Sequence, residues 1–72
     1  GVPTSQHVKG ESADIAAEYP HELAKVVRDT PEIWREVDQI ILYPTFVHIS
    51  HRRGGPQRQQ LLYNRRYKGQ RL

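Results

Sequence analysis

The sequence predicts a small α+β domain built on an antiparallel β-hairpin, with one or two helices packed on one face of it. Two observations support this fold class. Two runs rich in β-branched and aromatic residues, Gln39–Tyr43 and Phe46–His51, are separated by only Pro44-Thr45. Two segments ahead of them, each opened by a proline, carry helical signals. With 72 residues, the chain is large enough for one domain at most.

The helical signals lie between residues 19 and 37. The Tyr19-Pro20 pair marks a boundary, because the residue before a proline avoids the helical region. From His21 onward, apolar residues recur at i, i+3 and i+4, which predicts an amphipathic helix to about Asp29; they are Leu23, Val26 and Val27. Thr30-Pro31 repeats the start signal. We therefore expect a second, short helix from Pro31 to about Val37, docked by Ile33 and Trp34.

The hairpin can be assigned a register. If the turn has two residues, paired positions sum to 89, and side chains alternate between the two faces. One face is then purely aliphatic and is predicted to be the core: Ile40, Leu42, Val47 and Ile49. The other face is predicted to hold the chemically active groups: Gln39, Ile41, Tyr43, Phe46, His48 and Ser50. The same register predicts Asp38 opposite His51 at the end of the hairpin.

The C-terminal region is interrupted and basic. Gly54-Gly55-Pro56 breaks regular structure, and residues 57–63 are expected to form a short helix or strand. From Asn64 we expect a mobile tail, so the predicted organisation is one domain over residues 1–63 and a basic tail over residues 64–72. Residues 52–72 contain seven basic groups and no acid, whereas residues 1–51 contain four basic groups and eight acids. A basic tail of this kind favours nucleic acid or another anionic polymer as a partner.

A candidate metal site lies near the N-terminus. His7 and Asp14 stand on either side of Gly10, and a glycine permits the bend that would bring them together. The best third ligand elsewhere in the chain is His48. The chain contains no cysteine, so any metal must use nitrogen and oxygen ligands. The plain alternatives are a surface histidine for His7, a helix cap for Asp14 and a cross-strand contact for His48.

Two stretches, SQHVKGESADI and DQIILYPTFVHIS, resemble the signature of zinc D-alanyl-D-alanine carboxypeptidases and related peptidoglycan endopeptidases. These are the LAS metallopeptidases, whose fold hedgehog signalling domains share. The resemblance extends from Gly1 to about Leu62 and implies that His7, Asp14 and His48 bind Zn²⁺ on the sheet face opposite the helices. It also implies hydrolysis of D-amino-acid-containing cell-wall peptides, in a bacterial or phage-encoded protein of the periplasm or extracellular space.

Two departures from that family pattern matter. Family members carry an Arg-bearing Ser-Gly-Tyr-Arg element ahead of this region, so residues 1–63 correspond to the C-terminal half of the peptidase domain. A complementary chain or self-association is then expected to supply the first half. Many relatives also have an acidic catalytic base shortly before the final histidine, where this chain reads Tyr43-Pro-Thr-Phe-Val47. Tyr43 is the remaining catalytic candidate, as a hydrogen-bond donor to an oxyanion; packing against Phe46 is its plain alternative.

Three functional hypotheses follow. The first is a zinc peptidase acting on peptidoglycan. The second is a catalytically silent relative that keeps zinc for stability or partner binding. The third is a basic nucleic-acid-binding module, which is the least favoured because the few aromatic residues of the tail show no order typical of base stacking. No apolar run approaches the length of a membrane span.

Overall fold

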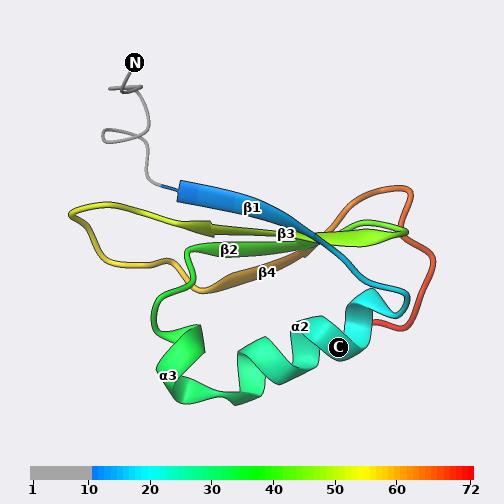
Figure 1. The fold of residues 1–72 in the computed structure, drawn as a ribbon, viewed down its shortest axis with the longest axis horizontal. Helices are drawn as coiled ribbons and strands as arrows, with labels where there is room; N and C mark the ends of the chain where they lie inside the picture. Colours follow the sequence, from blue (N-terminus) through cyan, green and yellow to red (C-terminus); the bar gives the residue numbers. More distant parts are fainter. Residues whose placement is uncertain (1–10) are drawn as a thin grey trace.

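The computed structural model describes residues 11–72, which form a four-stranded mixed sheet with two helices on one face (Figure 1). The elements follow the chain as β1 (Glu11–Ala16), α2 (Pro20–Asp29), α3 (Pro31–Trp34), β2 (Gln39–Leu42), β3 (Phe46–His51) and β4 (Gln60–Tyr63). The spatial order of the strands is β1-β3-β2-β4. The predicted α+β class, with helices on one face of an antiparallel hairpin, is confirmed.

The hairpin of β2 and β3 has the predicted register. Gln39 pairs with Ser50 and Leu42 pairs with Val47, so paired positions sum to 89. The side chains of Ile40, Leu42 and Val47 are fully buried, and Ile49 packs against them at the edge of the core. The aliphatic face is therefore the core face, as the alternation indicates.

Two further strands extend the hairpin into a sheet. Strand β1 pairs antiparallel with β3 over its whole length, from Glu11 opposite His51 to Ala16 opposite Phe46. Strand β4 pairs parallel with β2. Strand β3 finishes at the same end of the sheet at which β2 starts, because the two strands are antiparallel. The loop over residues 52–59 therefore stays at that end, and β4 can start there and run parallel to β2. The region predicted as a helix or a strand is thus a strand.

The helices cover the aliphatic face of the sheet (Figure 1). Helix α2 has the predicted extent and buries Ala24 and Val27 in the core. Helix α3 ends at Trp34, one turn before the expected end at Val37. Trp34 packs against the core, but Ile33 is 45 % exposed, so its predicted docking role is wrong. The reason is that Ile33 lines an open groove between α3 and β1 and does not reach the core.

The C-terminal segment lies against the body. We expected residues 64–72 to form a mobile tail, but Tyr67 is only 5 % exposed and belongs to the core. The Leu72 backbone N–H donates a hydrogen bond of 2.7 Å to the Tyr63 hydroxyl, and the Arg71 guanidinium lies 4.5 Å from the centre of the Tyr63 ring. The rings of Tyr63 and Tyr67 therefore attach this segment to the sheet, and the Arg71 guanidinium adds to the contact.

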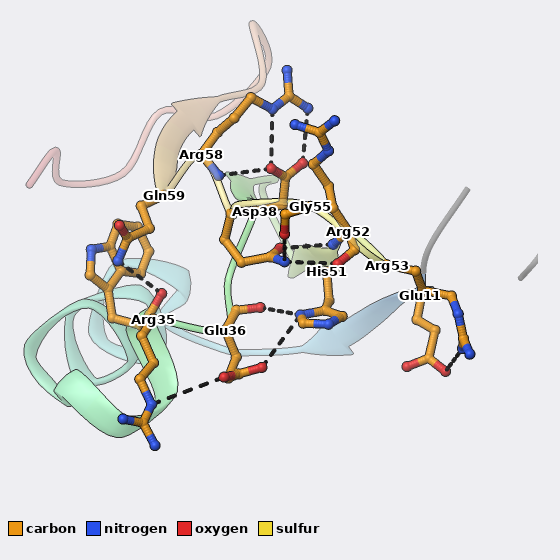
Figure 2. A network of polar contacts seen from close by, with 12 residues as sticks. Glu11, Arg35, Glu36, Asp38, His51, Arg52, Arg53, Gly55, Arg58 and Gln59 are labelled. Atoms are coloured by element: carbon orange, nitrogen blue, oxygen red, sulfur yellow. Dashed lines mark hydrogen bonds and ion pairs between the residues drawn. The ribbon is translucent and has the colours of Figure 1, made fainter. Parts of the chain in front are cut away.

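An ion pair between the buried Asp38 and the half-exposed Arg58 holds the loop between β3 and β4 (Figure 2). The Asp38 side chain, whose residue is 3 % exposed, accepts hydrogen bonds from the Arg58 backbone N–H at 2.9 Å and from its guanidinium at 2.9 and 3.1 Å. The Asp38 backbone N–H donates to the Ser50 carbonyl. The His51 ring, predicted opposite Asp38, instead contacts the Glu36 carbonyl at 2.6 Å.

Acid should weaken the fold through Asp38. Hydrogen bonding from Arg58, helped by the positive charges of Arg58 and Arg52, lowers the Asp38 pKa from 3.8 to about 2. Because folding lowers this pKa, the pair stabilises the fold fully above about pH 4 and loses that contribution as the pH falls through about 2. Urea unfolding should show a stability difference between the native protein and Asp38→Asn that shrinks over this range. Glu18→Gln, at an exposed carboxylate, is the control, and its small effect on the free energy of unfolding should stay the same over this range.

Gln59 adopts a left-handed backbone conformation, with φ of 56°. A side chain makes this conformation unfavourable by about 1–2 kcal/mol, and glycine removes that penalty while adding unfolded-state entropy. We therefore expect Gln59→Gly to raise the free energy of unfolding by about 0.5–1 kcal/mol. The same change at Gln60, inside β4, should lower it. A decrease on Gln59→Gly would mean that the hydrogen bond from the Gln59 side chain to the Trp34 carbonyl outweighs the backbone effect.

Candidate metal-binding face

The sheet face opposite the helices carries the residues that the sequence singles out for chemistry. By register, Asp14 of β1 pairs with His48 of β3, and His48 pairs with Ile41 of β2, which pairs with Leu62 of β4. Paired residues lie on the same face of the sheet. The face that holds Asp14 and His48 is opposite to the face on which Ile40 and Val47 are buried. Asp14 and His48 are therefore neighbours on the face that α2 and α3 leave uncovered.

The two side chains are in direct contact. The Asp14 carboxylate oxygen Oδ1 lies 2.7 Å from the His48 ring nitrogen Nδ1, although the residues are 34 positions apart in sequence. The side chains are 63 % and 31 % exposed, respectively, so solvent and solutes can reach the pair. Two of the three predicted ligands thus converge at one point of the surface.

This donor pair fits one side of a zinc site. Zinc binds imidazole nitrogen and carboxylate oxygen at about 2.0–2.2 Å, and two donors on one tetrahedral ion lie about 3.3 Å apart. The observed separation of 2.7 Å is a hydrogen-bond distance, which requires a proton between the two atoms, so a metal ion bound by both would have to replace that proton. Both donor types are nitrogen or oxygen, as a chain without cysteine requires.

The third predicted ligand, His7, lies outside the described residues. Within residues 11–72, no group of three or more His, Asp or Glu side chains is arranged to hold a metal ion. A site at Asp14 and His48 therefore needs a donor from another part of the chain or from another molecule.

Tyr43 sits at the end of the same face. Its ring stacks on Phe46, with centroids 4.3 Å apart and planes inclined by 8°, and its backbone N–H donates to the Phe46 carbonyl. The packing alternative considered for Tyr43 is therefore present. The ring stands two residues beyond Ile41, which pairs with His48, so Tyr43 lies diagonally from the histidine, as the hairpin register predicts.

The other two described histidines lie away from this pair. His21 packs edge-on against Tyr19, with ring centroids 6.3 Å apart. His51 lies near Glu36, with a second contact of 3.7 Å to the Glu36 carboxylate (Figure 2). Neither residue carries a metal motif in the sequence.

The pairing of β1 with β3 is the feature that sequence reasoning missed. From the sequence, we assigned Ser12–Ile15 no partner strand. The segment offers little signal for one, since Ile15 is its only large apolar residue and the alanines at 13 and 16 fall on opposite faces.

No protein-family model, curated protein or solved structure matches this chain. Among residues 11–72, no helix has the length and apolar character needed to cross a membrane.

Proposed function

We propose that this chain is the zinc-binding part of a metallopeptidase acting on D-amino-acid-containing peptides of bacterial peptidoglycan, with His7, Asp14 and His48 as metal ligands. The observation that carries the proposal is the 2.7 Å contact between Asp14 and His48. The two residues come from different strands and are 34 positions apart in the chain. The proposed location is the cell envelope.

The side chains of the site would have distinct roles. Asp14 and His48 would hold the ion on the open sheet face, and their solvent exposure would leave it accessible to a peptide. A bound zinc ion acidifies a coordinated water and polarises a carbonyl group. Two neutral histidines and one carboxylate contribute a net ligand charge of −1, so the site keeps a positive charge that favours an anionic intermediate. The Tyr43 hydroxyl, diagonal to His48, is the candidate donor to that intermediate.

One observation favours a second candidate, a catalytically silent zinc-binding relative. Hydrolysis needs an acceptor for the proton of the attacking water. Within residues 11–72, no third carboxylate or histidine joins Asp14 and His48. The Tyr43 side chain is a phenol, which donates a hydrogen bond readily but accepts a proton poorly. A protein that binds zinc without hydrolysing peptides would match these features.

Zinc stoichiometry tests the metal site. Metal analysis of the dialysed protein should show about one zinc per chain, and His7→Ala, Asp14→Ala and His48→Ala should each reduce zinc affinity by at least a hundredfold, since each removes one of three ligands. His21→Ala is the matched control, because His21 lies away from the pair, and it should retain zinc. Unchanged stoichiometry in His48→Ala would reject the site.

Hydrolysis separates the two candidates. Zinc-loaded protein incubated with a muropeptide ending in D-Ala-D-Ala should release free D-alanine, which can be quantified by chromatography. Release that disappears in His48→Ala supports the peptidase. Zinc binding without release, in the presence of any complementary chain found by copurification, supports the silent relative.

A further inference from the structure

A groove of about 630 Å³ lies on the helix side of the sheet, between β1 and α3. Its apolar surface comes from Ala13 and Ile15 of β1, Ile33 of α3, Val37 and Ile49. Ile15 and Ile33 are 42 % and 45 % exposed. The groove exists because α2 packs on β2 and β3, so the helix-side face of β1 has no covering layer among the described residues.

The outer edge of β1 adjoins this groove. Among the described residues, β1 pairs only with β3, and it forms one border of the sheet (Figure 1). The Ala17 N–H donates to the Thr45 carbonyl, which continues the β1–β3 register. In an antiparallel ladder, hydrogen-bonded pairs alternate with non-bonded ones, so odd-numbered residues direct their N–H and C=O groups toward β3. The backbone groups of Ser12, Asp14 and Ala16 therefore point outward, ready to pair with another strand.

The charges around the groove indicate which kind of peptide segment would bind there. Its lining contains the carboxylates of Glu11, Glu32 and Glu36, the His51 ring, and no lysine or arginine. Two of these carboxylates have long, exposed contacts with basic groups: Glu11 with Arg53 at 3.8 Å, and Glu36 with His51 at 3.7 Å and with Arg35 at 4.0 Å (Figure 2). An apolar floor with acidic borders is complementary to a segment that carries apolar side chains at its centre and basic ones at its ends.

A second copy of β1 fits this groove poorly. Strand β1 carries Glu11 and Asp14 and no basic residue. Asp14 lies on the opposite face, so pairing two copies through their β1 edges would bring a second Glu11 carboxylate to a groove whose lining already holds three glutamates, and like-charge repulsion would oppose such pairing.

We propose that the β1 edge and its adjoining groove bind an extended peptide segment of a partner protein, which adds a fifth strand to the sheet. The segment places apolar side chains against Ala13, Ile15 and Ile33 and basic side chains beside Glu11, Glu32 and Glu36. Main-chain hydrogen bonds to Ser12, Asp14 and Ala16 supply affinity, and the groove supplies selectivity. This inference is independent of the metal site, which lies on the opposite face of the sheet.

The probe is an acetylated, amidated heptapeptide, Lys-Thr-Val-Thr-Val-Thr-Lys, in which alternate residues present Lys, Val, Val and Lys to the groove. The matched control replaces both lysines with glutamate. Titration into the full chain in EDTA, followed by amide NMR, should show binding of the lysine peptide and at least tenfold weaker binding of the glutamate peptide. Amide exchange should slow at Ser12, Asp14 and Ala16. Equal affinity for the two peptides, or no binding at millimolar peptide, would overturn the proposal.

Two variants test whether the peptide binds along the β1 edge and beside the groove. Ser12→Pro removes an outward N–H that β3 does not use, so the fold should persist while peptide affinity falls at least tenfold. Glu32→Lys reverses a charge beside the groove and should weaken binding of the lysine peptide about five- to tenfold. Glu22→Lys makes the same charge change on α2, outside the groove, and should leave affinity unchanged. Slowed exchange at the three amides without peptide, together with a dimer in sedimentation, would assign the edge to a second copy and overturn the proposal.

Discussion

Leu42→Ala is expected to remove a large part of the stability of this domain. Leu42 is fully buried between the helices and the neighbouring strands, and truncating such a residue to alanine lowers the free energy of unfolding by about 2–5 kcal/mol, through lost burial and the cavity left behind. A domain of this size is stable by only about 4–11 kcal/mol. Urea unfolding followed by Trp34 fluorescence should therefore show a much lower midpoint or no folded baseline.

Leu62→Ala is the matched control. It makes the same chemical change in the adjacent strand β4, but Leu62 lies on the open face and is 39 % exposed. The free energy of unfolding should fall by less than about 1 kcal/mol. If the two variants lost equal stability, the open face would have to be covered in solution, and the assignment of the core to the helix side would be incomplete.

Zinc is expected to stabilise the protein strongly if the proposed site forms. A metal held only by the folded state adds its binding energy to folding, which amounts to about 2.7 kcal/mol when free zinc is 100 times its dissociation constant. For a domain of this size, we expect the midpoint of thermal unfolding to rise by about 10 °C or more. Calorimetry with zinc and then with excess EDTA measures this difference directly.

Variants of the proposed zinc ligands test whether this stabilisation comes from the proposed site. His48→Ala and Asp14→Ala should lose the zinc-dependent increase, whereas His21→Ala should keep it, because His21 contacts Tyr19 away from the site. An identical midpoint with zinc and with EDTA in the native protein would contradict both the peptidase and the silent zinc-binding relative, since both require the ion.

Local sequence patterns were sufficient to predict those elements whose structure depends on neighbouring residues. The hairpin register follows from a two-residue turn and a single aliphatic face, and α2 follows from a proline start and apolar spacing. The end of α3, the exposure of Ile33 and the burial of Tyr67 were not predictable in this way. Each depends on which part of the sheet a distant segment covers. Arg58 was likewise unremarkable in the sequence, and its importance comes from the buried Asp38 carboxylate that it neutralises.

The hairpin, the helix starts and the aliphatic sheet face were predictable from the sequence, because side-chain alternation and backbone preferences act over a few residues. Asp14 and His48 were also candidates at that level. The position of β1 beside β3 was known only from the three-dimensional fold, because strand pairing across 34 residues depends on which edge the completed hairpin leaves open. That pairing brings the carboxylate to the imidazole, and the same strand, left uncovered by α2, forms the groove and the open edge proposed for peptide binding.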